Sequence, residues 1–398
     1  MSCVPREDLD ARLRCLRQRL GERAPEWRAA LVMSKINLYY LTGTMPSGAL
    51  VIPRDGEAVL WVRRSLTRSS AESAFPRLQP MRSFRDIAAA WTDRPKSCLI
   101  EKERVSLAHF ERVCKYLPFE RFEELDPHLA AVRAVKSPWE LQRLEAAGRI
   151  HQQVLEEVVP TLLVEGMSEA ELGAEILRVM LRAGHHGVAR VGQFDTELFL
   201  GAVCFGENSI QPNPFDGPGG VEGLGPAVPL FGSQQRRLQR GDLVFVDVGC
   251  GIEGYHTDKT MTYAFGELPT AAAVAQRRCV EIQDAAARLL RPGAIPEQIY
   301  EAVTRELPAS FLEHFMGYGD QQVRFLGHGV GLHIDEFPVI ASGFKEPLEA
   351  QMTIALEPKK GLAGIGMVGI ENTFVVTADG GRSLTGASPG LIAVPCPA

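Results

Sequence analysis

The stretch Leu243–Phe265 reads LVFVDVGCGIEGYHTDKTMTYAF and decides the fold of the second half of the chain. Two runs rich in β-branched and aromatic residues flank a glycine-bounded turn, which is the pattern of a β-hairpin. If the turn is centred between Ile252 and Glu253, Asp247 lies directly opposite Asp258. Side chains in opposite positions have Cβ atoms roughly 4.5–5.5 Å apart, and like charges there are destabilising. The hairpin therefore predicts two facing carboxylates.

Both aspartates also interrupt otherwise apolar strands. Burying two unpaired carboxylates would be strongly unfavourable or would force them to take up protons. A bound cation would remove this conflict, because it supplies the positive charge that the two acids lack. The alternative is that both acids lie on a solvated strand face, and the hairpin alone leaves the two interpretations open.

Three later segments add one imidazole and two more carboxylates. The stretch GHGVG places His328 among glycines, where backbone can approach a ligand closely. TIALEPK places Glu357 at the end of an apolar strand, and MVGIENTFVV places Glu371 in the middle of another. Taken singly, such a histidine is typical of a turn, and such a glutamate is typical of a strand edge. Their combination with the two aspartates favours a shared site.

The four carboxylates carry a charge of −4, which two divalent cations would neutralise. Oxygen-rich ligation with one imidazole suits manganese, cobalt, iron or zinc better than a sulfur-based site would. We therefore expect two divalent metal ions, held by Asp247, Asp258, His328, Glu357 and Glu371. Manganese is the metal we expect first, with cobalt, zinc and iron as alternatives.

The bulk composition is that of an ordinary soluble protein. With 398 residues the chain is too long for one ordinary core, so we expect two domains. A net charge of −6 gives no basic surplus for nucleic acid or an anionic membrane. No apolar run approaches the roughly 18 residues of a membrane span. The charged N-terminal stretch lacks a secretory signal, and the eight cysteines contain no CxxC pair, so we expect a cytoplasmic protein with reduced thiols.

The first part of the chain has the pattern of an α/β domain. Leucines at helical spacing predict a helix over 6–22, and short apolar runs at 30–33, 48–52 and 59–62 alternate with helical stretches such as 107–116. No catalytic cluster is visible in it. We expect a domain of residues 1–134, followed by a second domain of residues 135–398.

The second domain begins with capped helices. Ser137 can cap a helix with Pro138 at its first position, and Ser168 and Glu171 have the spacing of a capping box. A similar glycine-introduced helix near 296–307 hints at an internal repeat. The Pro- and Gly-rich stretch at 211–232 predicts a long loop, either a functional lid or a plain surface insertion.

In these motifs the sequence resembles the pita-bread metallopeptidases: methionine aminopeptidase, prolidase and aminopeptidase P, with creatinase as a relative. INLYYLTG at 36–43 is similar to their N-terminal domain signature, and the KSP stretch from Lys136 to the start of their catalytic domain. Asp247-x-Gly with Asp258 eleven residues on, then GHGVG, LEP and GIEN, follows the family's five-ligand order. The resemblance implies an α+β protein, with a creatinase-like α/β N-terminal domain and a pita-bread catalytic domain of pseudo-two-fold symmetry.

The resemblance also implies a role for each ligand. Asp247 would bind one metal ion, His328 and Glu357 the other, and Asp258 and Glu371 would bridge the two. A water or hydroxide between the metals would be the nucleophile, since a metal pair lowers the pKa of water and polarises a carbonyl. Glu357 would take up its proton. The family further implies a homodimer that acts on a small peptide or another small molecule.

Three positions depart from the family's pattern. Its histidine seventeen residues before the first metal aspartate is here Leu230, its second histidine seven residues after the ligand histidine is Asp335, and its Thr-Arg-Thr has Met261 at the centre. The two missing histidines normally contact the scissile amide and help to transfer protons. If Leu332–Asp335 is extended, His333 and Asp335 share one face and can form a substitute pair for proton transfer. The alternative is that His333 and Asp335 are simply two polar residues on the protein surface.

Three functions remain open on the sequence. The first is a metal-dependent hydrolase of the Xaa-Pro dipeptidase or aminopeptidase type. The second is different small-molecule chemistry on the same scaffold, such as a lyase or an amidinohydrolase-like enzyme, for which Leu230 and Asp335 argue. The third is a non-catalytic binding module, against which the complete ligand set argues.

Overall fold

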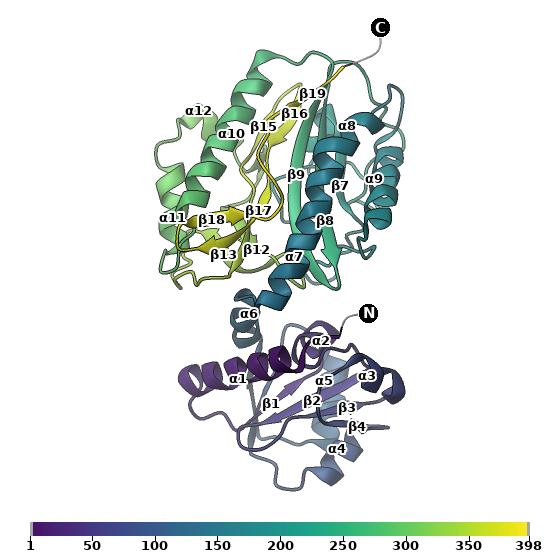
Figure 1. Ribbon diagram of the computed structural model, residues 1–398, viewed down its shortest axis with the longest axis vertical. Helices are drawn as coiled ribbons and strands as arrows, with labels where there is room; N and C mark the ends of the chain where they lie inside the picture. The colour runs from purple at the N-terminus through teal and green to yellow at the C-terminus, as the bar shows by residue number, and fades with distance from the viewer. Residues whose placement is uncertain (1–2, 396–398) are drawn as a thin grey trace. The chain divides into compact units, whose positions relative to one another are not determined.

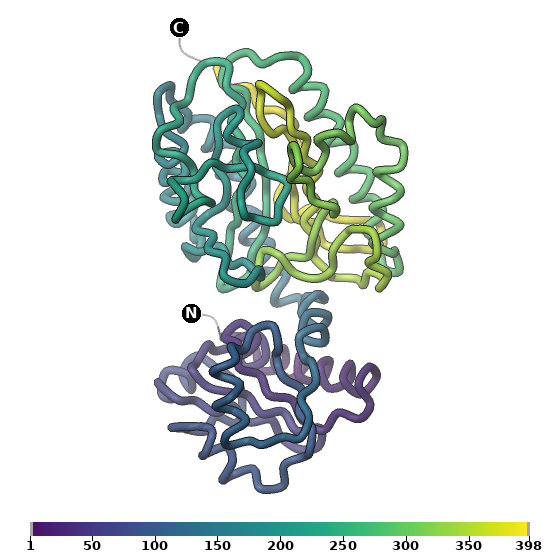
Figure 2. Tube along the Cα trace, turned by 180° about the vertical axis from the view of Figure 1, so that it is seen from behind, coloured from purple at the N-terminus to yellow at the C-terminus, as the bar shows by residue number. Residues whose placement is uncertain are grey.

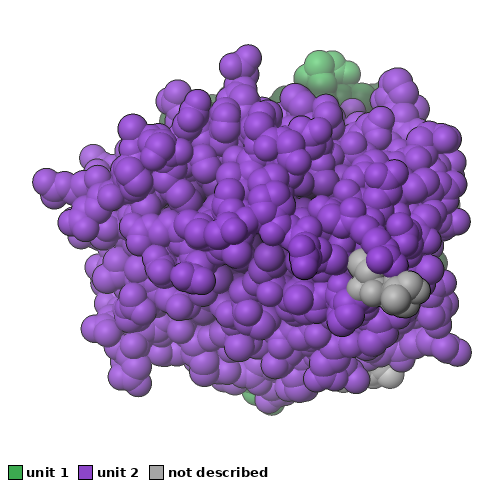
Figure 3. Space-filling model, turned by 90° about the horizontal axis from the view of Figure 1, so that it is seen from above, with its two compact units in different colours: residues 1–133 green, residues 134–398 purple. Residues whose placement is uncertain are grey.

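The computed structural model describes residues 3–395. The chain forms two compact units, Met1–Arg133 and Ala134–Ala398, which are coloured separately in Figure 3. Each unit buries hydrophobic core residues of its own. Within residues 3–395, no helix combines the length and apolar character needed to cross a membrane.

The first unit is built on one mixed six-stranded sheet. Its strands are β1 (Ala29–Val32), β2 (Gly48–Pro53), β3 (Val59–Val62), β4 (Leu78–Pro80), β5 (Ser97–Ile100) and β6 (Arg121–Glu124). They lie in the order β4-β3-β2-β1-β5-β6, with β1 antiparallel to β2 and parallel to β5. The helices are α1 (Arg6–Arg23), α2 (Lys35–Thr42), α3 (Leu66–Glu72), α4 (Phe84–Ala90), α5 (Leu107–Tyr116) and α6 (Asp126–Ala134).

The INLYYLTG stretch forms α2 and the glycine that ends it. Ser34 caps the helix by accepting from the Asn37 amide, and Gly43 ends it in the left-handed region at φ 75°. The carboxylate of the fully buried Glu101 accepts from the backbone N–H groups of Met33 and Ser34 and from the Asn37 side chain. One buried acid thus holds the end of β1 and the start of α2 in place.

The first half of the second unit is a four-stranded sheet covered by helices. Its helices are α7 (Pro138–His151), the π-helical η1 (Gln152–Val158), α8 (Val159–Leu162) and α9 (Glu169–Ala183). Its strands β7 (Gly201–Phe205), β8 (Asp242–Ile252), β9 (Tyr255–Phe265) and β19 (Ile392–Val394) lie in the order β19-β9-β8-β7, and the short helix η2 (Gly206–Ile210) follows β7. Both predicted caps are present as capping boxes, at Ser137 and Ser168.

The second half repeats this plan with a five-stranded antiparallel sheet. Its helices are α10 (Thr270–Leu289), α11 (Pro296–Thr304) and α12 (Ala309–Leu312). Its strands β12 (Phe325–Gly329), β13 (Glu336–Ala341), β14 (Thr353–Leu356), β17 (Asn372–Thr377) and β18 (Gly380–Ser383) lie in the order β13-β12-β14-β17-β18. Two small ribbons complete it, β10 (Gly317–Tyr318) with β11 (Gln321–Gln322) and β15 (Lys359–Leu362) with β16 (Gly366–Gly369).

The strands of the second unit lie between two sets of helices, with α7–α9 on one side and α10–α12 on the other (Figure 1, Figure 2). Each half runs through a long helix, a second helix and antiparallel strands, in that order, and the C-terminal β19 joins the first sheet parallel to β9. This is the pseudo-two-fold arrangement that the resemblance implies, and it places the inner strands of the two sheets next to each other.

The β8–β9 hairpin is present, but its predicted register is wrong. The turn consists of Glu253 and Gly254, both in the left-handed region at φ 48° and 97°, as a two-residue hairpin turn requires. The pairing is therefore shifted, and Asp247 lies opposite Thr260. Asp258 becomes a diagonal neighbour of Asp247, farther away than a directly opposite residue.

The cysteines within residues 3–395 are all free thiols: Cys3, Cys15, Cys98, Cys114, Cys204, Cys250 and Cys279. Cys396 lies outside the described residues. Burial raises the pKa of the Cys279 thiol to about 12, so that this side chain acts as a small apolar residue.

Glu169, the first residue of α9, should contribute strongly to stability. It is fully buried, burial raises its pKa to about 7, and its carboxylate accepts from the backbone amides of Phe205 and Ser233, each at 2.7 Å. Glu169→Ala would leave these amides unpaired, so we expect a loss of roughly 2–4 kcal/mol in the free energy of unfolding, measured by urea denaturation.

Glu165→Ala is the matched control. Glu165 is exposed and pairs with Arg240 at 3.4 Å, so its removal should change stability by no more than about 0.5 kcal/mol. Equal losses in the two variants would contradict the anchoring role of Glu169.

Candidate metal centre

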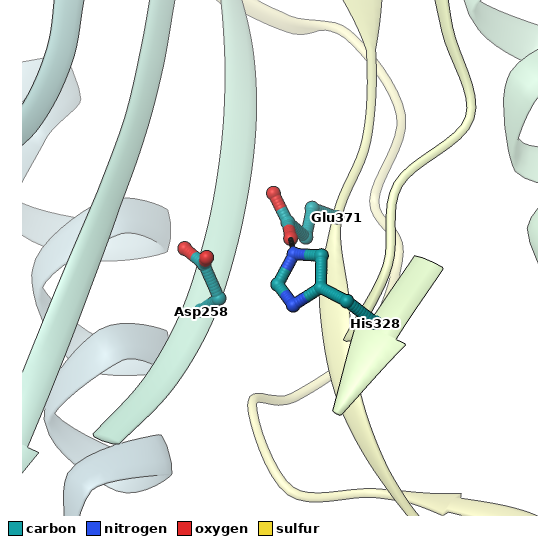
Figure 4. Close-up of side chains that lie close together, drawn as sticks. All are labelled: Asp258, His328 and Glu371. Carbon is teal, nitrogen blue, oxygen red and sulfur yellow. Dashed lines mark ion pairs between the residues drawn. The ribbon is translucent and has the colours of Figure 1, made fainter. Parts of the chain in front are cut away.

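The five predicted ligands come from both halves of the second unit and converge. Asp247 lies on β8, Asp258 on β9 and His328 on β12, while Glu357 directly follows β14 and Glu371 directly precedes β17. Figure 4 shows Asp258 on one strand, facing His328 and Glu371 from the other sheet. The chain thus brings together residues that are up to 124 positions apart, from Asp247 to Glu371.

Glu371 lies at a junction between strands and not, as predicted, in the middle of one. It forms an isolated bridge with Thr260 of β9, in which both backbone N–H···O distances are 3.3 Å. The Thr260 hydroxyl also donates to Glu371 Oε2 at 2.9 Å. Because β9 belongs to the first sheet and β17 to the second, this bridge joins the two halves at the site.

Two groups of ligand atoms are each close enough to share a cation. One atom each from Asp258, His328 and Glu371 lie within 4.8 Å of one another, and so do atoms from Asp247, Glu357 and Glu371. Glu371 belongs to both groups, which is the position of a bridging ligand. Glu357 also lies near the first group, since its Oε1 is 3.3 Å from His328 Nε2.

The imidazole of His328 is oriented with Nε2 toward the acids. Nδ1 lies 3.1 Å from the carbonyl of Gly329, which this nitrogen can satisfy as a donor, and Nε2 lies 3.3 Å from Glu357 and 3.7 Å from Glu371. Burial alone would lower the pKa of His328, but the hydrogen bond with Glu357 and the neighbouring carboxylate charges raise it to about 10. The imidazole therefore lies in a strongly negative environment.

Lys359, which is not among the predicted ligands, also lies in this cluster. Its side chain is fully buried, and Nζ lies 2.8 Å from Asp247 Oδ2, 2.7 Å from Glu357 Oε2 and 3.0 Å from Glu371 Oε2. Burial opposes the charge of Lys359, but the three carboxylates raise its pKa well above the ordinary value. A signal was present: Lys359 comes two residues after Glu357, and strand side chains two apart point to the same face.

The pocket holds more negative charge than its own cations balance. Burial raises the pKa of Glu371 to about 8 despite the nearby Lys359, and burial together with the charge of Glu371 raises that of Asp258 well above its ordinary range. Glu371 Oε1 is buried and has no hydrogen-bond donor among residues 3–395. An acceptor left in this way, beside one imidazole and a second carboxylate, fits a divalent cation bound by Asp258, His328 and Glu371.

The glycines around the ligands serve close packing. A Cβ at Gly327 would lie 2.1 Å from the Ala355 carbonyl, and one at Gly329 would lie 2.3 Å from the Phe337 carbonyl. The glycines beside His328 thus allow β12 to fit between its neighbouring strands, whereas the sequence analysis assigned them to ligand approach. Gly249 acts similarly, because a Cβ there would lie 2.5 Å from Ile334 Cδ1.

The premise of the predicted His333–Asp335 pair is wrong, because 331–335 is a series of bends and not an extended strand. The Asp335 carboxylate accepts from the backbone amides of Gly192 and, at 3.1 Å, Gln193. His333 is buried, and its backbone N–H donates to Glu336 at 2.8 Å. Asp335 therefore holds the segment around Gly192 against the end of β12.

The other two departures are Leu230 and Met261, and neither belongs to the two groups of ligand atoms. Leu230 is half-buried in the irregular segment that contains the predicted long loop. Met261 is buried in the apolar core that packs against the first sheet, where the guanidinium group of an arginine would not reach water. His256, which lies in the hairpin, is fully buried with Nδ1 3.1 Å from the Gly331 carbonyl, and burial together with His186 lowers its pKa to about 3.

The predicted loop at 211–232 borders the site. A Cβ at Gly219 would lie 3.1 Å from the Phe245 ring and 3.8 Å from Asp247 Oδ2, so the loop backbone passes directly beside this acid. Ile210 belongs to the same small apolar cluster as Phe245, and Tyr318 packs against this cluster. They also border a cleft of about 600 Å³, lined by Glu207, Ile210, Gln211, Pro212, Tyr318, Gly319, Asp320 and Gln321.

The fold and the site together define a class, the two-domain metal-dependent hydrolases with a pseudo-symmetric catalytic unit. Residues 142–378 match metallopeptidase family M24, and residues 12–135 match the creatinase/prolidase N-terminal domain. Because the first match spans more than half of the chain, the chain belongs to metallopeptidase family M24.

Characterised proteins of this kind resemble the chain over nearly its full length. The Xaa-Pro dipeptidase of Pyrococcus furiosus is 26% identical over 89% of this chain and 92% of its own length. The crystal structure of dipeptidase PepE from Mycobacterium ulcerans superposes with a TM-score of 0.80 at 26% identity, covering 99% of this chain and 100% of its own. The prolidase structure from Pyrococcus horikoshii, at 24% identity, shares the fold with a TM-score of 0.77 over 95% and 98% of the two chains.

Glu371 should be indispensable for metal binding, because it belongs to both groups of ligand atoms. For Glu371→Ala we expect metal content, measured by elemental analysis after reconstitution with manganese, to fall to trace amounts, and turnover to fall to background. The exposed Glu349 supplies the control, Glu349→Ala, which should keep the wild-type metal content. Full metal content in Glu371→Ala would refute the assignment.

Proposed function

We propose that the chain hydrolyses the peptide bond of small Xaa-Pro peptides in a metal-dependent reaction. The observation that carries the proposal is the buried group of Asp258, His328 and Glu371, in which one carboxylate oxygen has no donor among the described residues. Membership of metallopeptidase family M24 and the full-length similarity to an Xaa-Pro dipeptidase support the same chemistry.

In this proposal Asp258, His328 and Glu371 hold a divalent cation, with manganese expected first and cobalt, zinc or iron as alternatives. The cation would supply Lewis-acid chemistry, lowering the pKa of a water and polarising the amide carbonyl. The resemblance implies two ions, one at Asp247 and the other at His328 and Glu357, with Asp258 and Glu371 as bridges. The second group of neighbouring ligand atoms comes from Asp247, Glu357 and Glu371. The atoms of that second group are the ones that Lys359 contacts.

The protein's own groups would move the protons. Glu357 presents Oε1 toward His328 at 3.3 Å, at the edge of the first group, which suits a carboxylate that takes a proton from the attacking water. His333 is a buried imidazole five positions after His328, and we propose that it returns a proton to the leaving amine. Asp335 would position this segment through its bonds to the segment around Gly192.

The surroundings suit a short substrate. The cleft has a volume of about 600 Å³, within the range of roughly 300–1,000 Å³ of small-molecule sites. Tyr318 offers an apolar surface, and Gln211 offers an amide group for one end of a peptide, whereas the Gln321 amide is already bonded to the backbone of Asn213. The loop that passes Gly219 closes the side next to Asp247.

A substrate panel on metal-reconstituted protein tests the proposal. We expect turnover of Xaa-Pro dipeptides, loss of turnover on chelation and recovery when manganese or cobalt is restored. Longer Xaa-Pro peptides and small methylated amines or sulfonium compounds complete the panel. Turnover of only the amines or sulfonium compounds would reject the peptidase in favour of other chemistry on the same scaffold, and stable binding without turnover would indicate a binding module.

His333→Ala separates proton transfer from metal binding. We expect kcat to fall about 100-fold or more, as for the loss of a general acid, with metal content unchanged and KM little altered. The pH dependence of kcat should lose one limb, because the titrating donor is gone. An unaltered kcat and pH profile would remove His333 from the mechanism.

A further inference from the structure

The ammonium group of Lys359 has a hydrogen-bond acceptor for each of its three N–H donors. Nζ carries three N–H donors, and three carboxylate oxygens surround it at 2.7–3.0 Å: Asp247 Oδ2, Glu357 Oε2 and Glu371 Oε2. The side chain is fully buried, so no water competes for these contacts. Three charge-assisted hydrogen bonds of this length make a defined binding arrangement for a single positive charge.

These three residues are the second group that could hold a metal ion. A carboxylate-bound metal lies about 2.0–2.2 Å from its oxygens. The nitrogen of Lys359 already lies among the oxygens that such an ion would need, at ordinary hydrogen-bond distances. A metal ion and this ammonium therefore compete for one position.

The strand geometry directs Lys359 to this place. Lys359 is the first residue of β15 and pairs with Gly369 of β16, where a Cβ would lie 2.6 Å from Lys359 Cγ. Any larger residue at 369 would displace the lysine stem. The ammonium ends 5.8 Å from the centre of the Phe245 ring, which covers it on one side. The neighbouring Lys360 points away, and its Nζ donates to the Ser310 carbonyl at 3.4 Å.

The first group remains open to a metal ion. The hydrogen-bond partners of Lys359 Nζ are Asp247, Glu357 and Glu371, and not Asp258 or His328. Lys359 bonds to Oε2 of Glu371, whereas Oε1 of the same carboxylate has no donor among residues 3–395. Oε1 is also the Glu371 oxygen that pairs with His328 Nε2, at 3.7 Å. The two oxygens of Glu371 thus serve two different cations, one of them part of the chain.

We propose that Lys359 permanently takes the place of one of the two metal ions, so that each chain binds a single divalent cation, at Asp258, His328 and Glu371. This inference rests on the metal centre of the proposed function. Lys359 offsets one of the four carboxylate charges and a divalent cation offsets two more. The internal ammonium holds Asp247 and Glu357 in place whether or not metal is bound.

Metal stoichiometry tests the proposal on the full-length protein. The protein is stripped with a chelator, reloaded with excess manganese or cobalt, freed of unbound ions and analysed for metal per chain. We expect one ion per chain in the wild type and two in Lys359→Ala, which vacates the three-carboxylate position. Lys360→Ala removes the adjacent lysine that points away and should stay at one ion per chain.

The proposal would be overturned by two ions per chain, or none, in the wild type. It would also be overturned by a folded Lys359→Ala variant that still binds only one ion per chain. Should that variant fail to fold, electron paramagnetic resonance of the manganese-loaded wild type decides. The spectrum of isolated ions supports the proposal, and that of a spin-coupled pair overturns it.

The proposed function can fail separately. One ion per chain without any Xaa-Pro turnover would reject the peptidase activity and leave the role of Lys359 intact. Two ions per chain with good dipeptide turnover would reject the role of Lys359 and support the peptidase activity.

Discussion

The second unit depends on keeping four carboxylates close together out of water. Asp258, Glu357 and Glu371 are almost completely buried, and Asp247 reaches the same group from β8. Such a cluster is stable only if positive charge lies within it. His328 and Lys359 supply part of that charge, yet burial raises the pKa of Glu371, and its Oε1 has no donor among residues 3–395. The fold thus creates a strong requirement for a cation at one defined place.

The same place joins the two halves of the unit. The bridge between Thr260 and Glu371 connects a strand of the first sheet with the start of a strand of the second. Around it, Gly249 and Gly327 allow neighbouring segments to approach more closely than a side chain would permit. The charged ligands, the closely packed glycines and the bridge between the two sheets therefore lie at the same place. A change to one ligand should for this reason affect both the chemistry and the structure of the site.

The centre keeps the predicted ligands, although other residues around them differ from the expected pattern. All five predicted ligands lie at the centre, yet a lysine contacts three of them, and Asp335, where the resemblance leads us to expect a histidine, holds the segment around Gly192. The substitutions are compatible with the fold because Gly369 leaves room for the lysine stem, and because the backbone amides of Gly192 and Gln193 donate to the Asp335 carboxylate.

The sequence by itself determined the capped helices, the hairpin, the two-domain plan and the set of five candidate ligands, because caps, strand periodicity and ordered motifs are local patterns. Only the tertiary structure decided the pairing of Asp247 with Thr260, since a two-residue turn at Glu253 sets the register. It alone also placed Lys359 among the acids. A lysine next to a motif is normally solvated, and whether its ammonium lies in water or between carboxylates depends on strands that are distant in sequence.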